Sequence, residues 1–209
     1  MADNYLENKF EEFRNKPAAK KHTASLSTLL RNNRSYRGYD KRYVVTEAQL
    51  RRIAEVCTRI PSGRNQQVLR FKLLTRETGS EKMQGRYKLG GALPELHLPF
   101  PGTEPEAFIL ICSTVAPDKW VHMDVGIAAQ SMLLKATEMG LGGICIGAFS
   151  KDALVETFAL PCEPVLVLAI GKPAEKIEIV PVRAGEPLKY YREDGVHYVP
   201  KITAGDLIL

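Results

Sequence analysis

Two loops in the first third of the chain carry residue types that could bind a ligand. The first contains Arg34-Ser35-x-Arg37, with two guanidinium groups and one hydroxyl close together. Arginine presents a planar fork of donors that matches phosphate oxygens, so the motif is typical of an anion-binding loop. A basic helix end that complements its own dipole is a second interpretation. Nucleic-acid binding is a third, because aromatic residues that could stack on bases are interleaved, namely Tyr36, Tyr39 and Tyr43.

The second loop, residues 60–67, contains Pro61-Ser62-x-x-Asn65-x-Gln67. Its two amide side chains each offer a donor and an acceptor, which suits the edge of a heteroaromatic ring. The alternative is that these amides only satisfy the backbone of their own loop.

A glycine-rich turn, Gly140-Leu141-Gly142-Gly143, joins a helix predicted from Asp124 to a strand predicted over residues 144–149. Gly140 is placed just past the helix, where a left-handed conformation is expected. Glycines of this kind let a flat ring approach the backbone, although tight helix–strand packing explains them equally well. A Rossmann dinucleotide loop is excluded, because its glycines follow a strand and open a helix.

Hydrophobic periodicity predicts the elements that hold these loops. Thr23 is expected to cap a helix whose Leu26, Leu29 and Leu30 face inward, and Thr46 with Gln49 forms a capping box. The other helices are expected at 5–16, 46–59, 124–139 and 151–158. The strands are expected at 69–75, 108–115, 144–149, 165–170, 177–182 and 196–199.

The composition is that of a globular protein, with 209 residues, 44% hydrophobic and 25% charged. No apolar run approaches the ~18 residues of a membrane span. The stretch MADNYLENKFEEF carries acids and lacks an apolar signal region, so we do not expect secretion by that route. The four cysteines show no metal-site spacing and the four histidines are scattered, so we expect a reduced, cytoplasmic protein without a metal site.

Charge is distributed unevenly along the chain. Residues 1–88 hold 20 Lys and Arg against 9 Asp and Glu, whereas residues 89–209 hold 9 against 15. The first part therefore carries +11 and the second −6. This asymmetry predicts an anionic ligand, or simply a solvated basic surface.

Taken in order, these motifs resemble the nitroreductase family of flavin enzymes. The resemblance also uses Asp124-Val-Gly126-Ile-Ala128-Ala-Gln130 in the central helix and Gly171-Lys-Pro173 after a late strand, and it covers roughly residues 25–185. The chain departs from the family pattern where Asn33 precedes Arg34 and where Val68-Leu69 replaces a Pro-Trp pair. Residues 76–106 match no motif.

The resemblance implies an α+β fold with a central, mostly antiparallel sheet flanked by helices. It implies a single FMN-binding domain over residues 1–209, with an N-terminal helix at 1–22 and a C-terminal arm at 174–209 that extends to a partner subunit. One FMN would lie at each subunit interface of a homodimer.

Carried over residue by residue, the resemblance places Arg34, Ser35 and Arg37 at the FMN phosphate and ribityl end, with Arg183 as a distal phosphate ligand. The ribityl chain and ring edge would be met by Pro61, Ser62, Asn65 and Gln67. The backbone under the isoalloxazine would come from Cys145, Ile146 and Gly147.

The implied function is ping-pong oxidoreduction, in which NADH or NADPH reduces the flavin and a small nitroaromatic, quinone or similar acceptor reoxidises it. The flavin carries the chemistry, so no catalytic side chain is expected, and neither nucleic acid nor membrane is an expected partner. Alternatives are other flavin chemistry (dehalogenation, flavin destruction or azoline oxidation), a basic nucleic-acid-binding module, and a flavin-binding protein without turnover.

Overall fold

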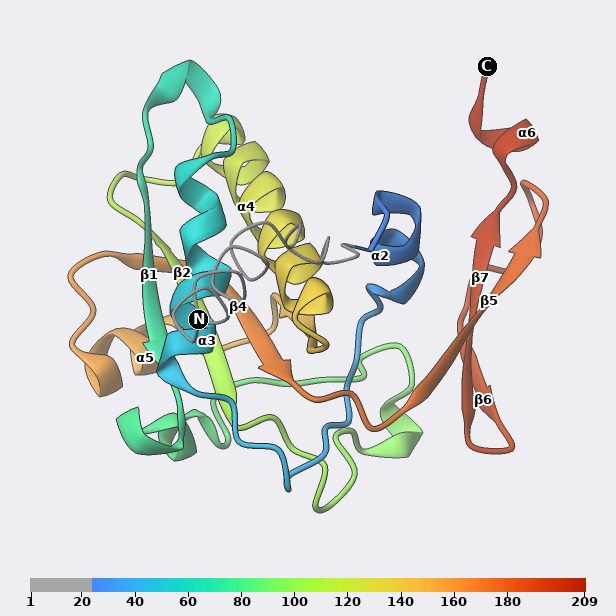
Figure 1. Ribbon diagram of the computed structural model, residues 1–209, viewed down its shortest axis with the longest axis horizontal. Helices are drawn as coiled ribbons and strands as arrows, with labels where there is room; N and C mark the ends of the chain where they lie inside the picture. Colours follow the sequence, from blue (N-terminus) through green and yellow to red (C-terminus); the bar gives the residue numbers. More distant parts are fainter. Residues whose placement is uncertain (1–23) are drawn as a thin grey trace, which may run out of the picture.

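The main body is built on an antiparallel sheet of four strands in the order β1-β2-β4-β3. The computed structural model describes residues 24–209 (Figure 1). The strands are β1 (Leu69–Leu74), β2 (Ala107–Ser113), β3 (Gly142–Ile146) and β4 (Glu163–Gly171). The predicted central antiparallel sheet is thus confirmed, while the helix predicted at residues 5–16 lies outside the described residues.

Strand β2 lies at the centre of the sheet because all seven of its residues are apolar or small, and all seven are buried. Its alternate side chains enter two separate cores. Ile109 and Ile111 face the core beneath helices α3 (Glu47–Ala54) and α4 (Lys119–Glu138), while Phe108 and Leu110 face the core beneath α5 (Lys151–Phe158). The sheet is therefore covered on both faces.

Helix α3 begins at the predicted capping box, in which Thr46 and Gln49 bond each other's backbone. The predicted helix 46–59 is shorter in the structure, since residues 55–58 form a 3₁₀ turn. Helix α5 has the predicted bounds, although the Ser150 hydroxyl makes no capping bond.

Helix α4 starts five residues before the predicted Asp124. Asp118 is its N-cap, and the Asp118 carboxylate accepts hydrogen bonds of 2.9 Å from the backbone N–H groups of Trp120 and Val121. The predicted buried stripe is confirmed in α4, and Gly140 takes the expected positive φ of 73° just past its end. The start was misplaced because an aspartate inside the helix was interpreted as its beginning.

Helix α2 (Leu26–Asn32) lies beside α4, outside the layers that cover the sheet (Figure 1). Ser25 caps it, whereas the predicted cap Thr23 lies outside the described residues. The prediction that its leucines face inward is wrong for two of the three, because Leu26 is 63% and Leu30 44% exposed, while Leu29 is half-buried. The two turns of α2 pack along one neighbouring helix. The rest of the α2 surface is not covered by any part of residues 24–209.

The C-terminal segment forms a second, smaller sheet that stands apart from the main body (Figure 1). Its strands β5 (Lys176–Val182), β6 (Tyr191–Glu193) and β7 (Val196–Ile202) pair in the order β5-β7-β6, and a short helix α6 (Ala204–Leu207) follows. We call residues 174–209 the arm. Within residues 24–209, no helix combines the length and apolar composition that crossing a membrane requires.

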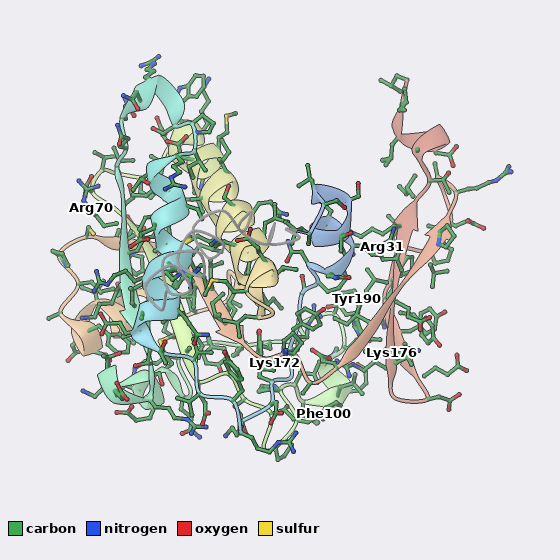
Figure 2. The ribbon with its side chains drawn as sticks, in the orientation of Figure 1. Arg31, Arg70, Phe100, Lys172, Lys176 and Tyr190 are labelled. Carbon is green, nitrogen blue, oxygen red and sulfur yellow. The ribbon has the colours of Figure 1, made fainter. Side chains whose placement is uncertain are left out.

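A buried carboxylate fixes the arm to the main body. Glu175 accepts hydrogen bonds from the backbone N–H groups of Arg37 and Gly38, and it pairs with Arg192 of the arm. The Tyr190 hydroxyl is 3.4 Å from the Arg37 guanidinium, and Figure 2 shows Tyr190 between the main body and the arm. The arginine loop and the arm are therefore held as one unit.

Candidate functional site

The arginine loop is pinned against the start of strand β3. Ser35 forms a parallel bridge with Gly143, whose carbonyl accepts a hydrogen bond of 3.2 Å from the Tyr36 N–H. The loop is thereby placed beside the predicted ligand-facing segment of β3.

Tyr36 and Tyr39 fill space beside glycines. A Cβ added at Gly142 would lie 2.5 Å from the Tyr36 ring, and one at Gly171 would lie 2.5 Å from the Tyr39 ring. Burial raises the pKa of Tyr39 well above its ordinary value, so its hydroxyl stays protonated. Because these rings are packed against the sheet, they are not free to stack on nucleic-acid bases.

Both arginines of this loop keep an unsatisfied donor. The Arg34 guanidinium bonds the Leu30 carbonyl, and that of Arg37 bonds the Ser35 carbonyl at 3.0 Å. In each residue, however, the Nε–H is buried without a hydrogen-bond partner. An unpaired buried donor is costly, so each of these N–H groups is a candidate donor to an anion such as a phosphate.

The edge strand β3 leaves less room for a ligand to approach its backbone than its glycines suggest. Added Cβ atoms at Gly143 would lie 2.4 Å from the Ala169 carbonyl oxygen, so the requirement for glycine here comes from strand packing. The prediction of a ligand-facing glycine ledge is wrong for Gly142 and Gly143. Open space begins further along, where Cys145 is exposed and nothing lies within 4 Å of a Cβ built on Gly147. Ile146 faces the core, so only its backbone could meet a ligand.

The amide loop is shaped by its own side chains. The Ser62 hydroxyl accepts the Gln67 N–H at 3.0 Å, and the Gln67 amide donates to Asn65 Oδ1 at 2.9 Å. Three residues of this loop have positive φ, namely Arg64, Asn65 and Gln67. Within the described chain these bonds leave Asn65 Nδ2 as a donor and Gln67 Oε1 as an acceptor, the pair expected for a heteroaromatic edge.

A cavity of about 300 Å³ opens between this loop, helix α3, strand β1 and helix α4. Three predicted residues line it together, Pro61, Ser62 and Gln67. Cys57 also lines it, and burial raises the pKa of the Cys57 thiol to about 11, so it remains a protonated thiol at neutral pH.

The two loops lie toward opposite ends of helix α4. The amide loop is tied to its first half, because the Asp124 carboxylate accepts the Gly63 N–H at 2.8 Å, whereas the arginine loop meets β3 beyond its last residue. From Asp124 to Glu138 the helix rises about 21 Å. Figure 2 accordingly shows Arg70, which lines the cavity, and Tyr190 on different sides of the main body.

One chain therefore carries two separate half-sites. We call Arg34, Ser35, Arg37 and Cys145–Gly147 the phosphate half, and residues 61–67 with their cavity the amide half. Arg183 lies next to neither, because it follows β5, a seven-residue strand that leads away from Glu175 for about 23 Å.

Comparison with known proteins identifies the family of the chain. The sequence profile of the Nitroreductase family matches residues 30–172, which is more than half of the chain. The chain belongs to the nitroreductase family. Its membership makes it an oxidoreductase of that family, as the motifs predicted.

Relatives of this nitroreductase-family chain are distant. The Bacillus subtilis protein YdgI, provisionally named an NAD(P)H nitroreductase, is 24% identical over 190 residues, covering 74% of this chain and 91% of YdgI. A variant of the FMN- and NADPH-dependent nitroreductase NfnB from Sphigopyxis sp. strain HMH has a TM-score of 0.61 at 21% identity, covering 72% of this chain and 89% of its own. A nitroreductase family protein from Clostridium difficile 630 has a TM-score of 0.57 at 23% identity, covering 73% and 86%.

Sequence reasoning missed two residues of the amide half. Asp124 was assigned to the helix start, yet it is 6% exposed and holds the amide loop. An aspartate one position before the buried Val125, in a stretch of α4 that has no other charged residue between Lys119 and Lys135, is the available signal. Arg70, which lines the cavity and bonds the Gln67 carbonyl at 2.9 Å, directly follows the amide motif.

Proposed function

We propose that this nitroreductase is an FMN-dependent enzyme that uses NADH or NADPH to reduce a nitroaromatic, quinone or similar small acceptor. The observation that carries the proposal is the pair of buried, unpartnered Nε–H donors of Arg34 and Arg37, in the loop that pairs with the start of β3. In this proposal the donors meet a phosphate, and the exposed backbone further along β3 accepts the flat ring that the phosphate carries.

Each half-site has its own part in the proposal. Arg34, Ser35 and Arg37 hold the phosphate, and the backbone of Cys145–Gly147 lies along the ring. Ser62, Asn65 and Gln67 bind the ribityl chain and the ring edge, in the loop that Pro61 opens. When bound, FMN would supply hydride transfer, and the chain supplies position and charge.

We further propose that the complete site forms between two copies of the chain. A ring system that touches both halves cannot span the length of α4 within one chain, whereas a second α4 running in the opposite direction places one phosphate half near the other amide half. The outer face of α4 supports this, since it carries an exposed apolar stripe, Trp120, Met123 and Ile127.

The arm fits the same arrangement. Its exposed apolar side chains include Ile179, Leu188 and Tyr191, and it stands off the main body where a partner could lie beneath it (Figure 1). In this proposal the arm covers the partner subunit, and Arg183 near its far end acts as a distal phosphate ligand in the assembled dimer.

A flavin titration tests the cofactor. The purified chain is expected to retain FMN and its visible absorption, and Arg34→Gln is expected to weaken FMN affinity about tenfold or more, because a charge-assisted hydrogen bond is lost. Arg42→Gln is the matched control, since Arg42 pairs with Asp40 at 2.8 Å on the surface. Failure of the wild-type chain to retain FMN would overturn the proposal.

Turnover distinguishes the possible reactions. Anaerobic NADH or NADPH should bleach the flavin, and a panel of nitroaromatics, quinones, halogenated aromatics and azolines should identify the acceptor that restores its colour. Sedimentation of wild type and Ile179→Asp tests the dimer, and the variant is expected to shift toward monomer. Bound FMN that neither nucleotide reduces would contradict the enzymatic role.

A further inference from the structure

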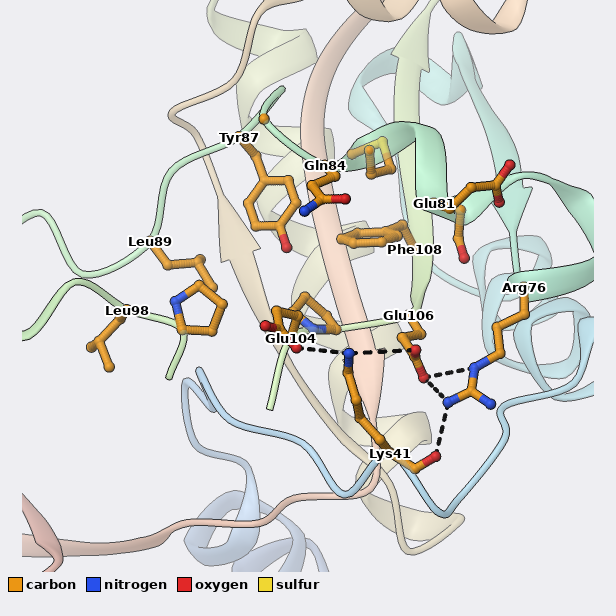
Figure 3. A pocket seen from close by; sticks show the side chains of 15 residues that line it. Lys41, Arg76, Glu81, Gln84, Tyr87, Leu89, Leu98, Glu104, Glu106 and Phe108 are labelled. Carbon is orange, nitrogen blue, oxygen red and sulfur yellow. Dashed lines mark hydrogen bonds and ion pairs between the residues drawn. The ribbon is translucent and has the colours of Figure 1, made fainter. Parts of the chain in front are cut away.

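The arginine loop leaves its positive charges without carboxylate partners. A cavity of about 420 Å³, formed mainly by segment 76–106, shows the opposite arrangement (Figure 3). On its wall the cations Lys41 and Arg76 are both paired with glutamates, at 2.7 Å in each case. In the part of the chain that the structure describes, no carboxylate oxygen lies within 4.0 Å of a guanidinium nitrogen of Arg34 or Arg37. The loop is therefore the place where an anion would meet uncompensated charge.

A carboxylate does lie close to the arginine loop, but its oxygens are already engaged. Glu175, whose side chain is 7% exposed, accepts hydrogen bonds from two successive backbone N–H groups of the loop, those of Arg37 and Gly38. Its other oxygen pairs with Arg192 of the arm. The Glu175 carboxylate therefore fixes the path of the loop backbone and ties it to the arm, whereas the Arg37 guanidinium has no paired carboxylate.

The arm also supports the Arg37 side chain directly. The Arg37 guanidinium carbon lies 5.0 Å from the centroid of the Tyr190 ring, and one guanidinium nitrogen is 3.4 Å from the Tyr190 hydroxyl. The Tyr190 ring in turn packs on the buried His197 ring at 5.0 Å. Another guanidinium nitrogen donates to the Ser35 carbonyl at 3.0 Å. The orientation of Arg37 is therefore set jointly by its own loop and by the base of the arm.

We propose that Glu175 is a positioning residue for the anion site, so that docking of the arm and binding of the FMN phosphate are coupled. With the arm docked, Glu175 holds the backbone of residues 37–38 and Tyr190 holds the Arg37 side chain. With the arm undocked both supports are lost, and the loop must be ordered again before it binds an anion. The coupling rests on the proposed function, since the anion is taken to be the FMN phosphate.

The charge of Glu175 allows a test in which two explanations predict opposite results. If the carboxylate acted only through its electric field, Glu175→Gln would remove a negative charge beside an anion site and tighten FMN binding. Because Glu175 positions the loop, we expect the variant to weaken FMN binding about fivefold or more, as measured by fluorescence titration of the full chain. Glu178→Gln is the matched control, since it changes the same charge in an exposed pair with Lys176, and the affinity should stay within about twofold.

Two further variants show whether Glu175 acts through Arg37. In Arg37→Gln protein there is no guanidinium to position, so the addition of Glu175→Gln should change FMN affinity by less than about twofold. Tyr190→Leu removes the support on the arm side without changing any charge, and should weaken FMN binding about threefold. If Glu175→Gln does not fold, as judged by thermal unfolding, Tyr190→Leu decides, and an unchanged affinity in that variant would overturn the coupling.

Hydrogen exchange provides the reciprocal measurement, because coupling between two equilibria acts in both directions. FMN, at concentrations that saturate each protein, should slow exchange of the amides of residues 190–197 in the wild type and have little effect on them in Glu175→Gln. Unchanged or tighter FMN binding in Glu175→Gln would overturn the coupling and leave the proposed function intact. Failure of the wild-type chain to bind FMN would overturn both.

Discussion

The two sheets of this nitroreductase-family protein differ in how much of their surface is buried. In the main sheet, strand β2 is buried along its whole length and both faces are covered by separate cores. In the arm, none of the seven residues of β5 is buried, and β7 has two buried residues in seven. The main sheet therefore has its own hydrophobic core, whereas the arm has little.

The arm instead depends on polar anchoring at its base. Glu175, whose side chain is only 7% exposed, joins the arginine loop to Arg192, and the His197 ring lies 5.0 Å from that of Tyr190. A segment that is fixed at one end and exposes apolar side chains such as Ile179, Leu188 and Tyr191 is suited to covering another surface. The following predictions test this contrast, from the largest effect to the smallest.

Shortening one side chain in each sheet should show most clearly how the main sheet and the arm differ in their contribution to stability. Leu110→Ala in β2 removes a fully buried side chain and should lower the free energy of unfolding by about 2–5 kcal/mol in urea denaturation. Ile179→Ala in β5, where the side chain is 44% exposed, should cost less than about 1 kcal/mol under conditions where the protein is monomeric. Similar losses in the free energy of unfolding of the two variants would contradict the difference between the main sheet and the arm.

Two glycine positions test how tightly the main sheet is packed. Gly143→Ala would place a methyl group 2.4 Å from the Ala169 carbonyl oxygen, so β3 must shift away from β4. We expect a loss of about 3 kcal/mol in the free energy of unfolding. Gly147→Ala, with nothing within 4 Å of its Cβ, should be nearly neutral for stability. A neutral result at both positions would contradict the packing role of Gly143.

The anchor of the arm should respond to loss of one charge. Glu175→Gln leaves Arg192 without its carboxylate partner, and should weaken docking of the arm by about 2–3 kcal/mol. Hydrogen exchange would report this as faster exchange of the amides of residues 176–202, with the main sheet still protected. Glu178→Gln is the control, because its pair with Lys176 is exposed and worth at most about 1 kcal/mol.

Acid should loosen the arm before it affects the main sheet. Burial, together with the charges of Arg192 and Arg37, lowers the pKa of His197 to about 4, while Glu175 acts in the opposite direction. In the detached arm His197 binds a proton near pH 6.5, so docking is complete above that pH and weakens as pH falls, by about 2 kcal/mol at pH 5 and about 3 kcal/mol at pH 4. Hydrogen exchange measured between pH 7 and pH 4 should show this slope, and His197→Gln should flatten it.

Much of the fold could be predicted because its signals are local. The Thr46–Gln49 capping box, the buried stripe of α4 and the left-handed Gly140 follow from short-range rules, and the structure has all three. One error was local, because the Asp118 cap was overlooked and α4 was therefore started at Asp124. The other came from tertiary contacts, since Leu26 is exposed because α2 has no second layer within the described residues.

The site could be predicted only in parts. Spacing identified the arginine and amide loops, but it could not show that they lie toward opposite ends of one helix. Gly142 and Gly143 suggested a surface for a ligand. Their positions in the sequence do not show that Tyr36 and the Ala169 carbonyl fill that space. The cavity of segment 76–106 was invisible, because its lining comes from residues 41 to 108 and follows no period.

The separation of the half-sites has a consequence for mixed populations of the proposed dimer. Suppose that one chain is damaged at Arg34 and another at Gln67, each inactive when it pairs with itself. When the two are unfolded and refolded together, a hybrid gathers both defects into one pocket and leaves the other pocket wholly intact. Activity would then reappear from two inactive parents, which cannot happen if each chain holds a complete pocket of its own.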